Sequence, residues 1–188
     1  MAKQKNNIIM RNTRGMVGKQ IVFKRRGGRS YVAAPPEVNE NRKATDKQLA
    51  VQQKFRSSIA YAKAALANAD TKEAYEKAAS RGQSAFNVAF KDAFSAPEVL
   101  GIIAGGYQGA AGNVIVVHAT DNFKVNAVKV AICNSENELI EEGAATANTD
   151  GLSWSYTVQQ SNPDVTGTKI KASAFDIPEN EGSLEVTL

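Results

Sequence analysis

The sequence predicts an α+β chain in three parts: an N-terminal β-hairpin arm, a small three-helix bundle and a C-terminal antiparallel immunoglobulin-like β-sandwich. Two observations predict it. Two short β-type runs flank a double glycine near the N-terminus, and the apolar period switches from about 3.6 to 2 after Pro97. The boundaries that follow are 1–42 for the arm and linker, 43–96 for the bundle and 97–188 for the sandwich.

Composition places the chain among ordinary globular proteins, with 43% apolar and 22% charged residues in 188. No stretch approaches the roughly 18 uncharged apolar residues of a membrane helix, so we expect no membrane contact. Residues 1–7 are polar and basic, and the apolar run after them is far shorter than that of a secretion signal. The expected location is therefore the cytoplasm or a virion. The single cysteine, Cys133, excludes an internal disulfide.

Charge is strongly polarised along the chain. Residues 1–36 carry net +9 with no acidic side chain, residues 37–95 carry net +3, and residues 96–188 carry net −8. Such asymmetry points to a partner or an assembly more than to a fold.

The arm is predicted as a β-hairpin. Residues 21–23 and 30–33 are β-prone, and Gly27-Gly28 between them supplies the positive φ angles of a tight turn. Pro35-Pro36 ends the sheet because proline has no ladder donor. Two strands alone are marginally stable, so the hairpin should be anchored on the helices or on another subunit.

Three short helices are expected between residues 43 and 96. Thr45-Asp-Lys-Gln48 has the spacing of a capping box, which starts a helix that runs to about residue 69. Thr71 caps a second helix that Gly82 terminates, and a third begins near Ser84. The apolar faces of the first and third helices comprise Val51, Phe55, Ile59, Ala62 and Leu66, and Phe86, Phe90 and Phe94.

About seven short β-type runs, separated by turn residues, fill the last ninety positions. This count and spacing favour an immunoglobulin-like sandwich with Trp154 as the largest core residue, although the Cys-Trp-Cys pattern of true immunoglobulin domains is missing. The absence of helices between the strands excludes TIM-barrel and Rossmann folds. The runs are 99–103, 114–117, 128–132, 139–140, 152–158, 170–174 and 184–188.

Several motifs resemble a known group of proteins. The N-terminal half carries Gly15-x-Val17-Gly18, an Arg-rich turn, Val32 before Pro35-Pro36, Gln52-x-x-Phe55, Tyr61-Ala-Lys63, Tyr75 and Gly82-Gln-Ser-Ala-Phe-Asn87. It is similar to uncharacterised structural-type proteins of Bacteroidota and of the phages, including crAss-like ones, that infect them. Residues 113–180, with Asp121-Asn122, Trp154-Ser-Tyr156 and Ala174-Phe-Asp-Ile-Pro178-Glu-Asn180, resemble the immunoglobulin-like module often joined to that segment. The resemblance implies a virion-associated or mobile-element structural protein and supplies no catalytic residues.

No constellation of nucleophile, base and orienting group emerges from the residues. The glycine-rich segment 101–112 lacks a Walker lysine and precedes a strand, so we expect a connector. His118 lies near Asp121 in sequence, but no nucleophile is implicated with it, and Cys133 has no basic neighbour that would lower its pKa. The chain is therefore predicted to be non-enzymatic and to use no cofactor.

Acidic residues in the C-terminal half leave two alternatives open. Oxygen ligands for calcium could come from Glu136, Glu138, Glu141, Glu142, Asp176, Glu179 and Glu181, but the EF-hand spacing is absent. The other alternative is a set of solvated acidic loops. Asp121, Asp150 and Asp176 fit turn positions better.

The candidate contact site is the basic arm, which comprises Arg11, Arg14, Lys19, Lys24, Arg25, Arg26 and Arg29. Two partners fit it. Other protein subunits of a homo- or hetero-oligomeric assembly would offer an acidic surface, and nucleic acid would offer phosphates for nonspecific contact. The leading hypothesis is a structural or adaptor component of a macromolecular assembly, a phage virion. The alternative is an accessory nucleic-acid-binding protein.

Overall fold

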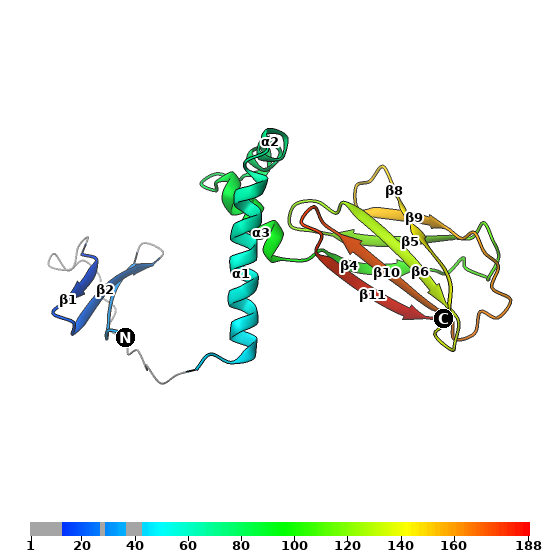
Figure 1. The fold of residues 1–188 in the computed structure, drawn as a ribbon, viewed down its shortest axis with the longest axis horizontal. Helices are drawn as coiled ribbons and strands as arrows, with labels where there is room; N and C mark the ends of the chain where they lie inside the picture. The colour runs from blue at the N-terminus through cyan, green and yellow to red at the C-terminus, as the bar shows by residue number, and fades with distance from the viewer. Residues whose placement is uncertain (1–12, 27–28, 37–42) are drawn as a thin grey trace. The chain divides into compact units, whose positions relative to one another are not determined.

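The computed structural model describes residues 13–26, 29–36 and 43–188. The chain divides into two compact units, Met1–Thr45 and Asp46–Leu188, which are described separately (Figure 1). Across the described residues there are three helices and three antiparallel sheets, so the α+β class is confirmed.

The first unit contains a three-stranded ribbon in the order β1-β2-β3, with bounds Gly15–Val17, Ile21–Arg26 and Arg29–Ala33. Strands β2 and β3 pair antiparallel up to Arg26 and Arg29. The turn predicted at Gly27-Gly28 lies outside the described residues. Strand β1 was not predicted. It joins β2 through Gly18 and Lys19, whose φ angles of 59° and 56° are typical of a type I′ hairpin turn.

The second unit begins with helices α1 (Asp46–Ala65), α2 (Ala69–Ala78) and α3 (Ala85–Phe94). Helix α3 begins next to Ser84, as predicted, and Ser84 caps it, because its hydroxyl accepts the Asn87 N–H. Asn68 rather than Thr71 caps α2: its side-chain oxygen accepts the N–H groups of Asp70 and Thr71. The Thr71 hydroxyl donates instead to the carbonyl of Ala65 at the end of α1.

The core of the bundle takes one residue from each helix: Ala62, Tyr75 and Ala89 are buried together. Phe123, from the loop between two strands of the sandwich, completes it, with its ring centroid 4.5 Å from that of Tyr75. The predicted boundary at residues 96–97 therefore falls inside one compact unit, because the bundle core includes a sandwich residue.

The N-terminal half of α1 extends beyond this core. Val51 and Phe55 were predicted to face the bundle, but they are 56% and 48% exposed. Phe55 packs edge-to-face against two rings of α3, those of Phe90 and Phe94, at 5.0 and 6.4 Å between centroids. The reason is length: α1 has 20 residues, whereas α2 and α3 have 10 each and cover only its second half.

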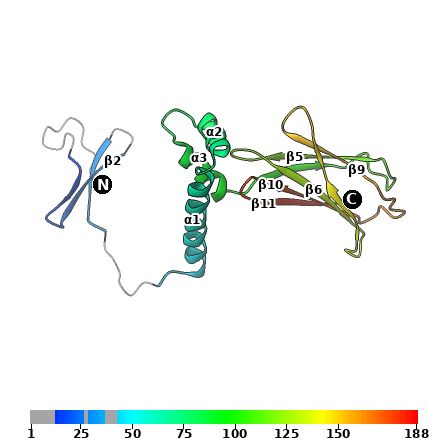
Figure 2. The same cartoon turned by 45° about the horizontal axis from the view of Figure 1, so that its top comes forward.

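Eight strands form two four-stranded antiparallel sheets, with orders β11-β10-β6-β7 and β4-β5-β9-β8 (Figures 1 and 2). All seven predicted runs are strands, and β8 is additional. The strands are β4 (Glu98–Ile103), β5 (Val114–Thr120), β6 (Ala127–Cys133), β7 (Leu139–Ala144), β8 (Thr146–Ala147), β9 (Ser153–Thr157), β10 (Lys169–Phe175) and β11 (Glu181–Thr187).

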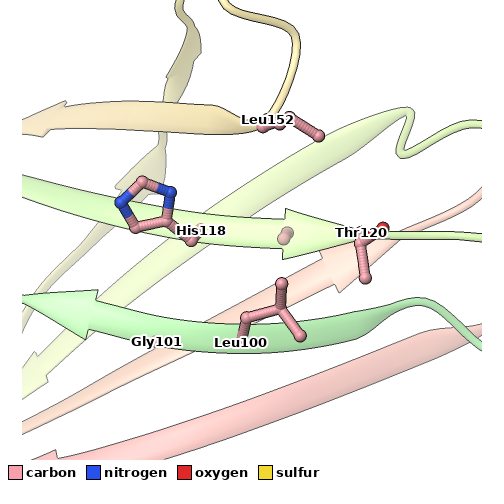
Figure 3. A pocket seen from close by; sticks show the side chains of 6 residues that line it. Leu100, Gly101, His118, Thr120 and Leu152 are labelled. Carbon is pink, nitrogen blue, oxygen red and sulfur yellow. The ribbon is translucent and has the colours of Figure 1, made fainter.

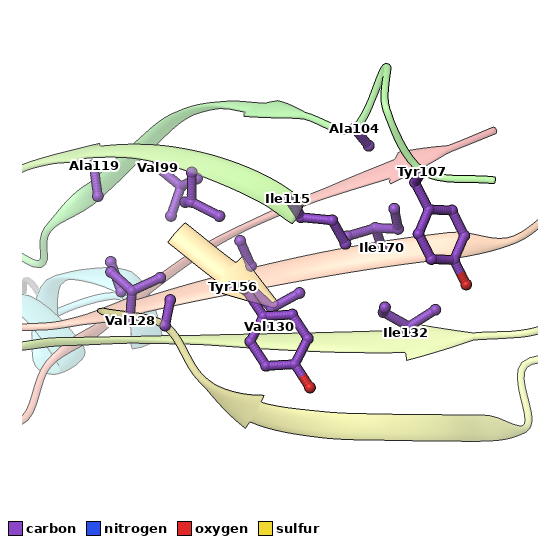
Figure 4. Close-up of a cluster of buried hydrophobic side chains, with 14 of the residues drawn as sticks. Val99, Ala104, Tyr107, Ile115, Ala119, Val128, Val130, Ile132, Tyr156 and Ile170 are labelled. Atoms are coloured by element: carbon purple, nitrogen blue, oxygen red, sulfur yellow. The ribbon is translucent and has the colours of Figure 1, made fainter. Parts of the chain in front are cut away.

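Alternating side chains of both sheets meet in one apolar core (Figure 4). Ile115 on β5 and Ile132 and Ile170 on β6 and β10 are fully buried. The prediction for Trp154 was wrong in part, because Trp154 packs against this core but stays partly exposed. Its neighbour in the sheet is the edge strand β8, which has only two residues. Tyr156, at 3% exposure, is the buried aromatic residue of β9.

None of the helices in the described ranges has both the length and the apolar character to cross a bilayer.

Candidate functional site

Five of the predicted contact residues have described side chains, and all five are exposed: Arg14, Lys19, Lys24, Arg25 and Arg29. Arg11 lies outside the described residues. The backbone of Arg26 ends β2, but its side chain is not described. The ribbon therefore presents its described cations to solvent, on strands, at a turn and before β1.

The ribbon ladder concentrates like charges. Arg26 lies directly opposite Arg29, and Lys24 and Arg25 precede this pair on β2. Like charges that face each other across a ladder are unfavourable. No acidic side chain among the described residues forms an ion pair with the five exposed cations. This arrangement favours an anionic partner surface.

Apolar side chains accompany the charges on the same ribbon. Met16 and Val17 on β1 are 52% and 60% exposed, and Ile21 on β2 is 42% exposed. Paired strands with an apolar, solvent-facing surface usually become buried against another element or subunit.

A second cluster was not predicted. Asp92 in α3, Asp121 after β5 and Asp176 after β10 each place a carboxylate oxygen within 4.8 Å of the other two. The loops of Asp121 and Asp176 meet because Phe175 at the end of β10 pairs with Ala127 at the start of β6, which follows the Asp121 loop. We call these three residues the aspartate cluster.

Turn hydrogen bonds hold two members of the aspartate cluster in place. Oδ2 of Asp121 accepts the N–H groups of Phe123 and Lys124, at 3.2 and 3.1 Å. Asp176 accepts the backbone N–H of Asn180 on Oδ1 at 2.6 Å and its side-chain amide on Oδ2 at 2.7 Å. The turn roles predicted for Asp121 and Asp176 are confirmed.

Asp92 is fully buried and is held by a tyrosine chain. Tyr75 donates its hydroxyl to Oδ2 of Asp92 at 2.6 Å, and the hydroxyl of Tyr61 lies 2.9 Å from that of Tyr75. The other oxygen of Asp92 has no hydrogen-bond partner. The same is true of Oδ1 of Asp121 and of the side-chain oxygen of Asn122, which are also buried.

Burial raises the pKa of Asp92 to about 7; the Tyr75 hydroxyl opposes this shift, whereas the neighbouring Asp121 and Asp176 add to it. Burial also raises the pKa of Asp176, against the hydrogen bonds from Asn180. Both shifts have the same origin, since desolvation and nearby carboxylates disfavour a further negative charge.

Side-chain amides tie α3 to the sandwich around this cluster. Asn122 donates to the carbonyl of Lys91 at 3.2 Å, and Asn180 donates to the carbonyls of Asp92 and Ala93 at 3.3 and 3.4 Å. The sequence analysis did not identify Asp92 as a candidate site residue. It could have been noticed because it is an aspartate among the phenylalanines and alanines of an apolar helix face.

Two of the glutamates considered as calcium ligands, Glu138 and Glu141, accept hydrogen bonds within the sandwich. Glu138 accepts from the side-chain amide of Asn134 at 2.8 Å. Glu141 is buried, and its Oε2 accepts the N–H groups of Gln159 and Gln160 at 3.0 and 3.1 Å. Among the described residues, the aspartate cluster is the group of acidic side chains whose ligand atoms converge.

His118 lies in a shallow depression on the outer face of β4, β5 and β9, together with the exposed side chains of Leu100 and Leu152 (Figure 3). The acidic residue that interacts with it electrostatically is Asp150, not Asp121 as their sequence proximity suggested. The side chain of Asp121 belongs to the aspartate cluster instead. Cys133 ends β6 as a free, half-buried thiol.

No family model and no curated protein matches this chain. CopC from Methylosinus trichosporium OB3b is 16% identical with a TM-score of 0.35, over 48% of this chain and 91% of CopC. A tetra-tandem repeat from the extending region of a large adhesion protein is 22% identical with a TM-score of 0.35, over 50% of this chain and 24% of that one. An engineered protein is 18% identical with a TM-score of 0.30, over 41% of this chain and 15% of that one.

Proposed function

We propose that this protein is a non-enzymatic structural or adaptor component of a macromolecular assembly, and that its basic ribbon docks on the acidic sandwich of a neighbouring copy. The observation that carries the proposal is the ribbon itself, where exposed cations and exposed apolar side chains occupy the same three strands. The resemblance to phage proteins of Bacteroidota is the reason we name a virion as the assembly.

Charge complementarity supports this partner. Residues 1–36 carry net +9, and residues 96–188 carry net −8. Most acidic side chains of the sandwich are exposed and therefore accessible to a second copy. They are Glu98, Glu136, Glu138, Glu142, Asp150, Asp164, Glu179, Glu181 and Glu185.

The apolar side chains of the ribbon favour protein over nucleic acid. Phosphate contacts neutralise charge but do not remove Met16, Val17 and Ile21 from water. A protein surface can do both, since interfaces combine an apolar centre with a charged rim.

We also propose that the sandwich is an immunoglobulin-like module. Taken in chain order as strands A, B, C, C′, D, E, F and G, β4 to β11 give sheets A-B-E-D and G-F-C-C′. Immunoglobulin domains pair their strands in this way, which supports the assignment. Such modules often serve as surface and interaction domains.

The test is charge reversal on the ribbon. A triple variant, Lys24→Glu, Arg25→Glu and Arg29→Glu, is compared with the wild type by analytical ultracentrifugation at low and high salt. Wild-type protein should self-associate at low salt, and both high salt and the triple variant should abolish association. A control triple variant in α1, Lys47→Glu, Lys54→Glu and Lys63→Glu, makes the same charge change and should still associate.

Gel shifts with random-sequence duplex DNA address the alternative. Salt-sensitive DNA binding that the ribbon variant loses, together with a monomer at every salt concentration, would replace docking by nucleic-acid binding. A monomer that binds no DNA would refute both roles of the ribbon.

A further inference from the structure

The aspartate cluster has an unbalanced charge. Asp92, Asp121 and Asp176 bring three carboxylates within 4.8 Å, and Asp92 and Asp176 are 0% and 1% exposed. Among the described residues, no lysine or arginine forms an ion pair with any of them. Fully ionised, the cluster would be strongly unfavourable, because buried like charges repel and lack water.

Hydrogen bonds hold these carboxylates in place, but some of their buried oxygens receive no hydrogen bond. Asp92 and Asp121 each receive donors on Oδ2, whereas their Oδ1 atoms are buried and without a partner. Each of the two residues nevertheless has a carboxylate oxygen within 4.8 Å of the other's. Two buried carboxylates this close need a proton or a cation to offset their charge.

A shared proton satisfies only part of this site. One proton can bridge Asp92 and Asp121, but the negative charge that remains is still buried. The side-chain oxygen of Asn122 is a third buried acceptor without a partner, on the residue next to Asp121. Its amide nitrogen donates to the carbonyl of Lys91, the residue that precedes Asp92 in α3. A multivalent cation attracts the three carboxylates of the cluster at once.

We propose that Asp92, Asp121 and Asp176 form a binding site for a divalent cation, Ca²⁺. All the donors are carboxylate or amide oxygens, the ligand type that calcium takes, and no nitrogen or sulfur ligand accompanies them. Their separations, all within 4.8 Å, are compatible with ligands around one ion whose Ca–O bonds are about 2.4 Å long. Calcium also accepts irregular ligand geometry, whereas magnesium requires a near-ideal octahedron. Water completes the coordination of calcium in many sites.

A calcium ion bound by these ligands would connect the helices to the sandwich. Asp92 belongs to α3, whereas Asp121 and Asp176 belong to two loops at one end of the sandwich. Around the cluster, amide-to-carbonyl hydrogen bonds from Asn122 and Asn180 join α3 to these loops. Bound calcium would link the three segments through one ion and hold α3 against the loops.

The first experiment uses the full-length protein, stripped with EDTA and dialysed at pH 7.5. Thermal unfolding is followed as Ca²⁺ or Mg²⁺ is added. We expect Ca²⁺ to raise the melting temperature, by about 5 °C at a hundredfold excess over its dissociation constant, and Mg²⁺ to raise it less. Isothermal titration calorimetry should give a stoichiometry of one.

Terbium locates the site. The Tyr75 hydroxyl lies 2.6 Å from Asp92, so Tb³⁺ bound at the cluster should emit on excitation of tyrosine, and Ca²⁺ should displace it. Asp92→Asn should abolish both the emission and the calcium-dependent shift. Should this variant fail to fold, Asp121→Asn serves instead, since asparagine retains the turn hydrogen bonds. Glu185→Gln, which removes one exposed charge from β11, is the matched control and should respond as the wild type does.

The proposal fails if millimolar Ca²⁺ leaves the melting temperature and the calorimetric baseline unchanged; the cluster is then a proton-sharing group. It also fails if Asp92→Asn and Asp121→Asn fold and still bind Ca²⁺ as tightly as Glu185→Gln does. Self-association of the ribbon is measured separately, so either result is independent of the proposed assembly role.

Discussion

The ring of Tyr156 occupies the space that a side chain on Gly143 would need: an ideal Cβ at Gly143 would lie 2.7 Å from Cε2 of Tyr156 and 2.9 Å from its hydroxyl oxygen. The two residues belong to opposite sheets, Gly143 to β7 and Tyr156 to β9. Tyr156 of one sheet therefore fits because residue 143 of the other sheet is a glycine.

Gly143→Ala should therefore destabilise the protein. Tyr156 is 3% exposed and packed in the core, so its ring has little freedom to move away. We expect a loss of about 1–3 kcal/mol in the free energy of unfolding, measured by urea denaturation. Gly106→Ala is the control, because a Cβ there meets nothing within 4 Å. Equal stability of the two variants would contradict the overpacking argument.

Tyr75→Phe tests the tyrosine chain. The change removes the donor to Oδ2 of Asp92 and leaves a buried carboxylate oxygen without its hydrogen bond. The free energy of unfolding in EDTA at pH 7.5 should fall by about 1–3 kcal/mol. Tyr61→Phe is the matched control, because Tyr61 is only half-buried and does not contact Asp92 directly. A larger loss for Tyr61→Phe than for Tyr75→Phe would show that the Asp92 hydrogen bond is not the stabilising one.

Asp150 provides a prediction on pH. Hydrogen bonds from the Ser153 hydroxyl and from the N–H groups of Leu152 and Ser153 lower its pKa to about 2. The unfolded value is about 3.9, so the contribution to stability is fully present above that pH and is lost as the pH falls through 2. Carboxyl ¹³C NMR should give a pKa near 2 for the wild type and a higher one for Ser153→Ala. An unshifted pKa in both proteins would contradict the turn geometry.

Local patterns predicted most of the fold because they depend on neighbours in sequence. Each predicted run after Pro97 is a strand, since alternation reports directly on a half-buried sheet. Ser84 caps α3 for a similarly local reason. The sequence did not predict β1, which has only three residues, Gly15–Val17, and is joined to β2 by the turn at Gly18.

The aspartate cluster could not have been found in this way. Asp92, Asp121 and Asp176 are separated by dozens of residues. The pairing of β10 with β6 brings the Asp121 and Asp176 loops together, and the packing of the helices on these loops adds Asp92. Asp121 and Asp176 were correctly interpreted as turn residues, but that interpretation concerns one oxygen or one loop at a time. The chemistry depends on the remaining oxygens and on Asp92, whose burial follows from tertiary packing.

Asn180 is expected to control how firmly α3 is held on the sandwich. Its side-chain amide donates to Asp176 and to the carbonyls of Asp92 and Ala93, whereas its backbone N–H independently closes the β10–β11 turn. Asn180→Ala removes the first set of bonds and retains the turn. In EDTA, the free energy of unfolding should fall by about 1 kcal/mol.

Hydrogen exchange shows which elements lose stability in Asn180→Ala. Amides of α3 should exchange faster in Asn180→Ala than in the wild type, while those of β6 and β10 in the sandwich core stay protected. Proteolysis should then cut more readily between α3 and β4, in residues 95–97, and release a protected β fragment. Asn134→Ala, which alters the β6–β7 turn, is the control and should leave α3 unchanged. If α3 exchanges at the wild-type rate in Asn180→Ala, the amide does not secure the helix, and packing of Phe123 on Tyr75 must hold the junction instead.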